Sequence, residues 1–130
     1  MGKLLIVSFI MLIGALSAFP QDLSLRGQGT LAQINGHVLF SWWNAYERIQ
    51  QDTNEQGDRV KGAMFIAYVA GVCDAEAVSK IPYFVLPSNV DANTVWRIVG
   101  KFLEAHPEEL NSQAIGLVEE ALSAVYPETE

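Results

Sequence analysis

Apolar side chains recur every three or four positions in four separate stretches of this 130-residue chain, and this spacing constrains the fold most. Such a spacing places apolar residues on one face of an α-helix and polar residues on the other. The four faces are Val38, Leu39, Trp42, Trp43, Tyr46 and Ile49; Phe65, Tyr68, Val69, Val72 and Ala75; Val95, Ile98, Val99, Phe102 and Leu103; and Ala114, Ile115, Val118, Ala121, Leu122 and Val125. No stretch alternates with a period of two for long enough to indicate a strand. The chain is therefore predicted to be all-α, a compact bundle of about four helices.

Polar residues and a glycine separate the first two predicted helices. Asn35 is an N-cap candidate for the first helix, because its side chain can accept a hydrogen bond from a free backbone amide. The polar run 50–58, with Gly57 as the break, ends this helix, and the second helix is predicted over residues 58–80. Gly71 lies within the second helix and costs up to ~1 kcal/mol relative to alanine. We interpret it, together with the alanines around it, as a close helix contact, which would make this helix the central one.

Prolines set the remaining helix boundaries. Two of them interrupt the apolar-rich segment 81–91, which is therefore predicted to be a loop. Asp91 follows as the N-cap candidate of the third helix. His106 and Pro107 stop that helix, and Pro107 also suits the first turn of the next one.

The N-terminal segment has the order of a secretory signal. Lys3 precedes the apolar run 4–16, and small residues come next. The run is shorter than the ~20 residues that span a bilayer, so residues 1–18 are predicted to be a cleaved signal peptide, with a retained anchor as the alternative. Residues 19–34 are interpreted as a flexible lead-in to one domain over residues 35–127. No later segment is long and apolar enough to enter a membrane.

The charge of the chain argues against two classes of partner. The chain has 8 basic and 15 acidic residues, a net charge of −7. Removal of Lys3 with the signal would leave 7 basic against 15 acidic residues, a net charge of −8. No basic cluster occurs, so nucleic acid and anionic lipid lack the electrostatic surface they require. An acidic exported domain instead suits a basic protein partner.

The reactive side chains do not form a catalytic or metal-binding pattern. His37 and His106 lie far apart in the sequence, without cysteines or carboxylates at ligand spacing. A nucleophilic pair of Cys73 with a histidine would also need an oxyanion donor and an orienting group. Neighbouring glutamates diverge by about 100° on a helix and cannot converge on a substrate. We predict no enzymatic activity, no cofactor and no metal.

Three further residues have more than one interpretation. Cys73 is the only cysteine, so an internal disulfide is excluded. We interpret it as a small buried apolar side chain, with an intermolecular disulfide or a reactive thiol as alternatives. Of Trp42 and Trp43, one is predicted to face the core and the other to be partly exposed, either for packing or as a partner contact.

Four segments in sequence order carry a family resemblance. They are AYVAGVCDA (67–75), VLPSNVDANTV (85–95), KFLEAHPEEL (101–110) and the AL..VYP ending (121–127). Together they resemble the Rap/Tai family of immunity proteins, over roughly residues 36–127. The residues that we interpret as structural parts of the shared motifs are Tyr68, Gly71, Pro87, Asp91, His106 and Pro107.

The resemblance implies a periplasmic function in Gram-negative bacteria. Members protect a cell from type VI secretion effectors, notably peptidoglycan amidases. They are small helical proteins, often dimers, that bind a cognate toxin and block its active-site cleft, and they are not enzymes. The alternative is a periplasmic acid-stress chaperone or another small helical binding protein, which would hold unfolded clients through apolar surface.

This sequence departs from the family pattern at several positions. Members often have cysteine pairs, around the first two helices and between the LP loop and the C-terminus. Here Trp43, Phe65, Val85 and Glu128 lie near those places. Asp91 also replaces the usual threonine cap, and Ala67 stands where glycine is common.

Two loops are candidates for the toxin contact, because a plug must project from a rigid scaffold into a cleft. The connection 50–58 offers Asp52, Glu55 and Asp58 to a basic rim. The loop 81–91 offers Tyr83 and Phe84 as anchors. In both cases the alternative is an ordinary connection, and the apolar residues of 81–91 would then cap the core.

Overall fold

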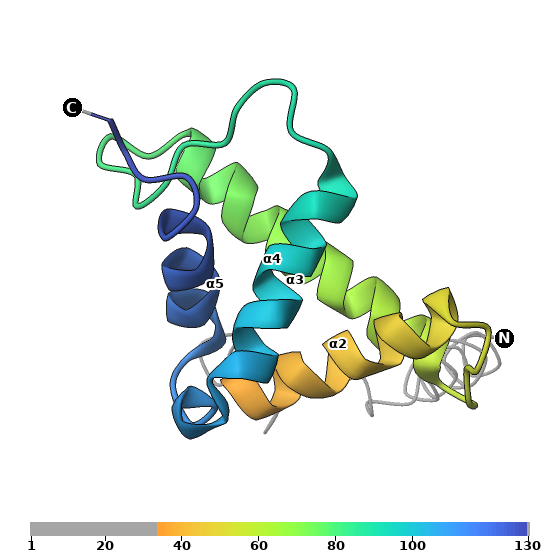
Figure 1. Cartoon of the computed structure of the whole chain (residues 1–130). Coiled ribbons are helices and arrows are strands. Elements are labelled where there is room, and N and C mark those ends of the chain that lie inside the picture. Colours follow the sequence, from red (N-terminus) through yellow and green to blue (C-terminus); the bar gives the residue numbers. More distant parts are fainter. Residues whose placement is uncertain (1–33, 130) are drawn as a thin grey trace, which may run out of the picture.

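The computed structural model describes residues 34–129, which form an all-α domain, as predicted (Figure 1). Its elements are α2 (Gly36–Gln50), α3 (Asp58–Ala77), α4 (Ala92–Ala105), the 3-10 turn η4 (Pro107–Glu109) and α5 (Ala114–Ser123). The predicted signal peptide and nearly all of the lead-in lie outside the described residues. No helix of the described part is both long and apolar enough to cross a membrane.

Helices α2 and α3 form a V, closed at the connection between them and open toward the other end (Figure 1). They approach closely near the closed end, where Gly62 faces Tyr46 and Ile49. A Cβ at Gly62 would be 2.9 Å from Cδ1 of Ile49 and 3.4 Å from Cα of Tyr46. Aromatic side chains fill the next layer, with ring centroids of Trp43 and Phe65 5.3 Å apart.

Helix α4 crosses this V (Figure 1) and meets α2 through Gly100 and Trp43. The Trp43 ring lies so close to Gly100 that an added Cβ would overlap it. Trp43 is fully buried, while its neighbour Trp42 is only partly buried, which confirms the prediction that the pair divides between core and surface.

The start of α2 is fastened to the segment before α5. Asn35 and Gln113 form an antiparallel bridge, and the Ala114 amide donates to the Ile34 carbonyl at 2.9 Å. The Asn35 side chain accepts from the Val38 amide at 3.1 Å, which confirms the predicted cap.

The core is continuous across all four α-helices. Its fully buried large side chains are Leu39, Trp43, Phe65, Val69, Val99, Leu103, Leu117, Val118 and Leu122. Every one of the four predicted apolar faces contributes to this core.

Three details of the predicted helices are corrected. Helix α3 ends at Ala77 rather than near residue 80. Pro107 opens the separate turn η4, and α5 begins only at Ala114. Gly71 is not a close helix contact: it is exposed, and a Cβ there would meet nothing within 4 Å. The close contacts are made instead at Gly62 and Gly100.

Candidate partner-binding surface

The connection between α2 and α3 is built around the buried carboxylate of Asp58. Arg48 donates to both oxygens of Asp58, at 2.8 and 2.7 Å, and the Glu55 amide donates to one of them at 2.8 Å. Asp58 is only 2 % exposed. The Arg48 hydrogen bonds, followed by the Glu55 amide, hold the pKa of Asp58 well below its ordinary value. The carboxylate of Asp58 is thus buried and already bonded within the fold, and a contact of Asp58 with a partner stays a prediction.

Two acidic residues of the same connection do remain available to a partner. Asp52 and Glu55 are exposed. The backbone turns sharply here, with Asp52 at φ 60° and Gly57 at φ 87° in the left-handed region. The Arg48–Asp58 pair thus fixes a short turn that carries negative charge on its outer side.

The segment after α3 alternates between outward and inward side chains. Tyr83 is 64 % exposed, Phe84 is 2 % exposed and Val85 is 53 % exposed. Phe84 forms a bridge with Pro127, and the Val85 amide donates to the Tyr126 carbonyl at 3.1 Å. This strand-like pairing turns the Phe84 ring into the core, which agrees with the alternative that the loop caps the core, and a contact of Phe84 with a partner stays a prediction.

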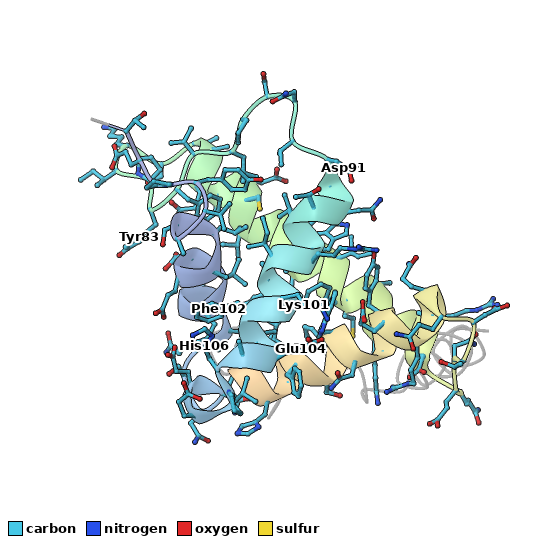
Figure 2. The ribbon with its side chains drawn as sticks, viewed as in Figure 1. Tyr83, Asp91, Lys101, Phe102, Glu104 and His106 are labelled. Atoms are coloured by element: carbon cyan, nitrogen blue, oxygen red, sulfur yellow. The ribbon has the colours of Figure 1, made fainter. Side chains whose placement is uncertain are left out.

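Tyr83 and its exposed neighbours form an apolar surface, which we call the apolar tip. Figure 2 shows Tyr83 at the margin of the molecule, where the C-terminal segment runs beside the loop after α3. The members of the apolar tip are Val78, Ile81, Tyr83, Val85 and Val125, each at least half exposed. Large apolar side chains this exposed on adjacent segments are typical of a protein interaction site.

The structure does not bring the two candidate loops together. Asp52 and Glu55 precede the start of α3, whereas the apolar tip follows its end (Figure 1). Helix α3 has 20 residues, and at 1.5 Å per residue its ends are about 30 Å apart. The two loops are therefore too far apart to enter the same narrow active-site cleft.

The residues of the family motifs support the scaffold in different ways. His106 caps α4, with Nδ1 donating to the Phe102 carbonyl at 2.8 Å and its ring stacked on Phe102 at 4.1 Å (Figure 2). Asp91 occupies the N-cap position of α4, but its side chain makes no capping bond. Its carbonyl accepts from the amides of Thr94 and Val95. Tyr68 packs edge-on against Trp42, and Pro87 is exposed.

A polar network spans the surface above the buried tryptophan. Trp43 Nε1 donates to one oxygen of Glu104 at 2.8 Å, and Lys101 Nζ donates to the other at 2.8 Å. Figure 2 shows Lys101 and Glu104 on the same stretch of α4. Burial alone would raise the pKa of Glu104, but the hydrogen bonds from Lys101 and Trp43 outweigh it and lower the pKa.

Sequence reasoning missed an apolar groove in the open side of the V. Its volume is about 660 Å³. The lining residues are Ile34, Trp42, Met64, Ala67, Tyr68, Gly71, Val72, Ala75, Gln113 and Ile115. The small residues Ala67, Gly71 and Ala75 were the available signal, but we interpreted them as a helix contact.

Cys73 lies on another side of α3, beside a smaller pocket of about 260 Å³. Burial, followed by the charge of Asp74, raises the pKa of Cys73 to about 11. The thiol is therefore protonated at neutral pH and a poor nucleophile. Within residues 34–129, no group of three or more His, Cys, Asp or Glu side chains could hold a metal ion.

Comparison with known proteins identifies the family. The model of the Rap1a immunity proteins matches residues 36–127, which include α2 to α5 and the C-terminal segment that pairs with Phe84. No curated protein and no solved structure matches the chain. Because the family model covers the whole helical domain, the chain belongs to the Rap1a immunity protein family.

Proposed function

We propose that this protein is exported to the periplasm, where it binds one cognate type VI secretion effector and blocks its active-site cleft. The effector that we propose is a peptidoglycan amidase. The observation that carries the proposal is the family match over residues 36–127, because that family consists of immunity proteins. The N-terminal segment supports export, since it has the basic start, short apolar run and small residues of a signal peptide.

The apolar tip is the contact surface that the geometry favours. Its outward side chains stand on a segment fixed from below by Phe84, which is buried, and by the Val85–Tyr126 hydrogen bond. Tyrosine is among the residue types that carry most of the binding energy in protein interfaces, and Tyr83 is the exposed aromatic residue of the apolar tip. Asp52 and Glu55 lie about 30 Å away and act through long-range attraction to a basic surface.

The first experiment is a pull-down of the exported protein with the product of the adjacent gene, followed by an assay of peptidoglycan amidase activity. A stoichiometric complex that abolishes the activity is expected. Light scattering of the complex then distinguishes a 1:1 from a 2:2 assembly. Absence of a complex, with a neighbouring product that is not toxic, would reject the immunity function and favour a chaperone.

The contact surface is tested by paired substitutions of exposed aliphatic residues. Ile81 is 81 % exposed in the apolar tip, whereas Val60 is 65 % exposed on α3 outside it. Ile81→Ser is expected to weaken binding at least about tenfold, since an interface anchor contributes ~2 kcal/mol or more. Val60→Ser is the matched control and leaves binding unchanged, because it removes apolar surface outside the apolar tip and adds no charge beside the acidic turn. Equal effects of the two substitutions would place the contact elsewhere.

The acidic turn is tested by the rate of association. The double change of Asp52→Asn with Glu55→Gln is expected to slow association at low salt, because it removes charge without altering the fold. Glu108→Gln changes another exposed carboxylate, on η4, and serves as the control. If both proteins associate at the wild-type rate, the acidic turn has no part in recognition.

A further inference from the structure

The smaller of the two pockets adjoins the apolar tip. Its volume is about 260 Å³, and its lining comes from the C-terminal end of α3 and the loop that follows (Figure 1). Val85 belongs to both surfaces, since it is exposed in the apolar tip and also lines the pocket. We call this pocket the tip pocket, and it is continuous with the surface proposed for the effector contact. The apolar part of its wall is formed by Ala77, Pro82, Phe84, Val85 and Leu86.

Among the described residues that line the tip pocket, Glu76 is the charged one. Its Oε2 atom accepts a hydrogen bond from the Tyr83 amide, so the loop after α3 holds the carboxylate in place. Glu76 belongs to neither of the two ion pairs found among residues 34–129. Lys80 is the nearest basic residue in the sequence, but it is exposed and does not line the pocket. Glu76 thus adds a fixed negative charge to a mainly apolar wall.

We infer that the tip pocket receives one lysine or arginine side chain of the effector, with its aliphatic stem against the apolar wall and its cation at Glu76. This inference rests on the proposed function and names the chemistry of the partner at the same surface. Lysine and arginine cover apolar surface with their methylene stems while the charged end stays at its edge. The volume of the tip pocket is below the ~300–1,000 Å³ typical of small-molecule sites, so a single side chain is an occupant of suitable size.

The charge of the protein favours the same kind of partner. The chain has a net charge of −7, and complementary charge brings a basic surface toward it over long range. Complementary charge also fixes the register of two bound surfaces. A cation inserted at Glu76 would set the register of the effector directly beside Tyr83, the exposed aromatic residue of the apolar tip.

The tip pocket is first tested in the exported protein alone, with small molecules that imitate the two side chains. n-Butylammonium has the stem and cation of lysine, n-propylguanidinium has those of arginine, and 1-pentanol is a neutral probe of similar length. Nuclear magnetic resonance titrations are expected to show saturable shifts of the Ser79, Val85 and Leu86 amides. We expect at least threefold tighter binding of a cation than of 1-pentanol. The cation that binds more tightly then indicates which side chain the pocket accepts.

Two substitutions show whether Glu76 causes this preference for cations. Glu76→Gln should abolish the preference, because glutamine still accepts from the Tyr83 amide but has no charge. Asp74→Asn is the matched control, since it removes an exposed charge two positions away that does not line the pocket. It should leave the preference unchanged. Cations that bind no more tightly than 1-pentanol, or a preference that survives Glu76→Gln, would overturn the inference.

In the complex with the effector, charge and space are tested separately by calorimetry. Glu76→Gln is expected to weaken binding at least about tenfold, because one partner of a desolvated charge pair is lost. Ala77→Leu fills the pocket without changing its charge and should weaken binding to a similar degree. Ala77 and Ala105 are the exposed last residues of α3 and α4, so Ala105→Leu is the matched control and should bind like the wild type. Unchanged melting temperatures would show that the variants are folded.

The outcomes separate a failure of this inference from a failure of the proposed function. A wild-type complex that neither Glu76→Gln nor Ala77→Leu weakens would overturn the inference and leave the immunity function intact. Absence of any wild-type complex would instead reject the proposed function, and with it the effector side chain as the occupant of the pocket. Weakening by both variants, with a preference for cations in the isolated protein, is the result that the inference requires.

Discussion

Replacing Gly100 with alanine tests how tightly the core is built around Trp43. The Trp43 ring is fully buried between α2, α3 and α4, and a Cβ at Gly100 would overlap it. Even the third-nearest ring atom, Cε3, would be only 2.5 Å from that Cβ. The ring cannot move away freely, because it stacks on Tyr46 at 5.5 Å and its Nε1 is bonded to Glu104.

Two opposing contributions determine how much Gly100→Ala changes the free energy of unfolding. Forcing an extra methyl group into a packed core costs ~1–3 kcal/mol and sometimes more, and this overlap belongs at the upper end. Alanine in place of glycine inside a helix gains ~1 kcal/mol. We therefore expect Gly100→Ala to lower the free energy of unfolding by about 2 kcal/mol. For a domain of this size, the melting temperature would fall by roughly 10 °C.

Thermal and urea denaturation, followed by circular dichroism, measure the melting temperature and the free energy of unfolding. Gly116→Ala in α5 is the matched control, because its Cβ would meet nothing within 4 Å. It should raise stability by up to ~1 kcal/mol. Combined with Trp43→Leu, which vacates the space, Gly100→Ala should become neutral or stabilising. A Gly100→Ala protein as stable as the wild type would refute the packing described for Trp43.

Three further results are expected. Arg48 holds the pKa of Asp58 below its ordinary value of 3.8. The ionised carboxylate therefore stabilises the folded state at pH values above 3.8. This stabilisation is lost as the pH falls from 3.8 through the lower pKa of the folded state. The difference in melting temperature between wild type and Asp58→Asn should thus be largest near pH 7 and narrow toward pH 3; a constant difference would contradict the pKa shift. Phe84→Ala should cost ~3–5 kcal/mol in urea denaturation, whereas Tyr83→Ala should leave stability unchanged and weaken effector binding; equal stability losses would contradict the alternation of the two rings. Cys73, whose pKa burial raises to about 11, should be alkylated by iodoacetamide at pH 8 much more slowly in the folded than in the unfolded protein, and equal rates would show that the thiol is accessible.

The helices were predictable because their causes are local. Apolar spacing, the Asn35 cap and the prolines each act within a few residues, and the predicted cap and core faces are confirmed. The two candidate residues whose burial the sequence did not indicate, Phe84 and Asp58, depend on partners elsewhere in the chain. Phe84 turns inward because Pro127 pairs with it, and Asp58 is buried because Arg48 bonds it.

The apolar groove shows the same limit in a different form. Small residues at Ala67, Gly71 and Ala75 are compatible with close helix packing or with an open groove wall. Which of these occurs depends on the angle between α2 and α3, and the close contact at Gly62 sets the closed end of their V. A periodic pattern identifies a face of a helix but does not determine what covers it.

The absence of the family's cysteine pairs has a structural explanation here. The resemblance places one pair near Trp43 and Phe65, and the structure confirms that these positions are neighbours, with ring centroids 5.3 Å apart. A disulfide stabilises mainly by restricting the unfolded chain, whereas two buried aromatic rings stabilise the folded state through burial and ring contact. The Trp43 ring leaves no room for a side chain at position 100 on α4, so Trp43 and Gly100 form one packing unit.

The second cysteine pair that the resemblance implies would lie near Val85 and Glu128, and here too noncovalent contacts join the two segments. Val85 and Glu128 flank the Phe84–Pro127 bridge, which joins the loop after α3 to the C-terminal segment without a covalent link. This bridge supports the apolar tip from below, so its strength controls how rigidly Tyr83 and Val85 are presented. Without a covalent link there, the proposed contact depends on the burial of Phe84. A change in effector specificity would then arise from the exposed residues of the apolar tip rather than from the missing cysteines.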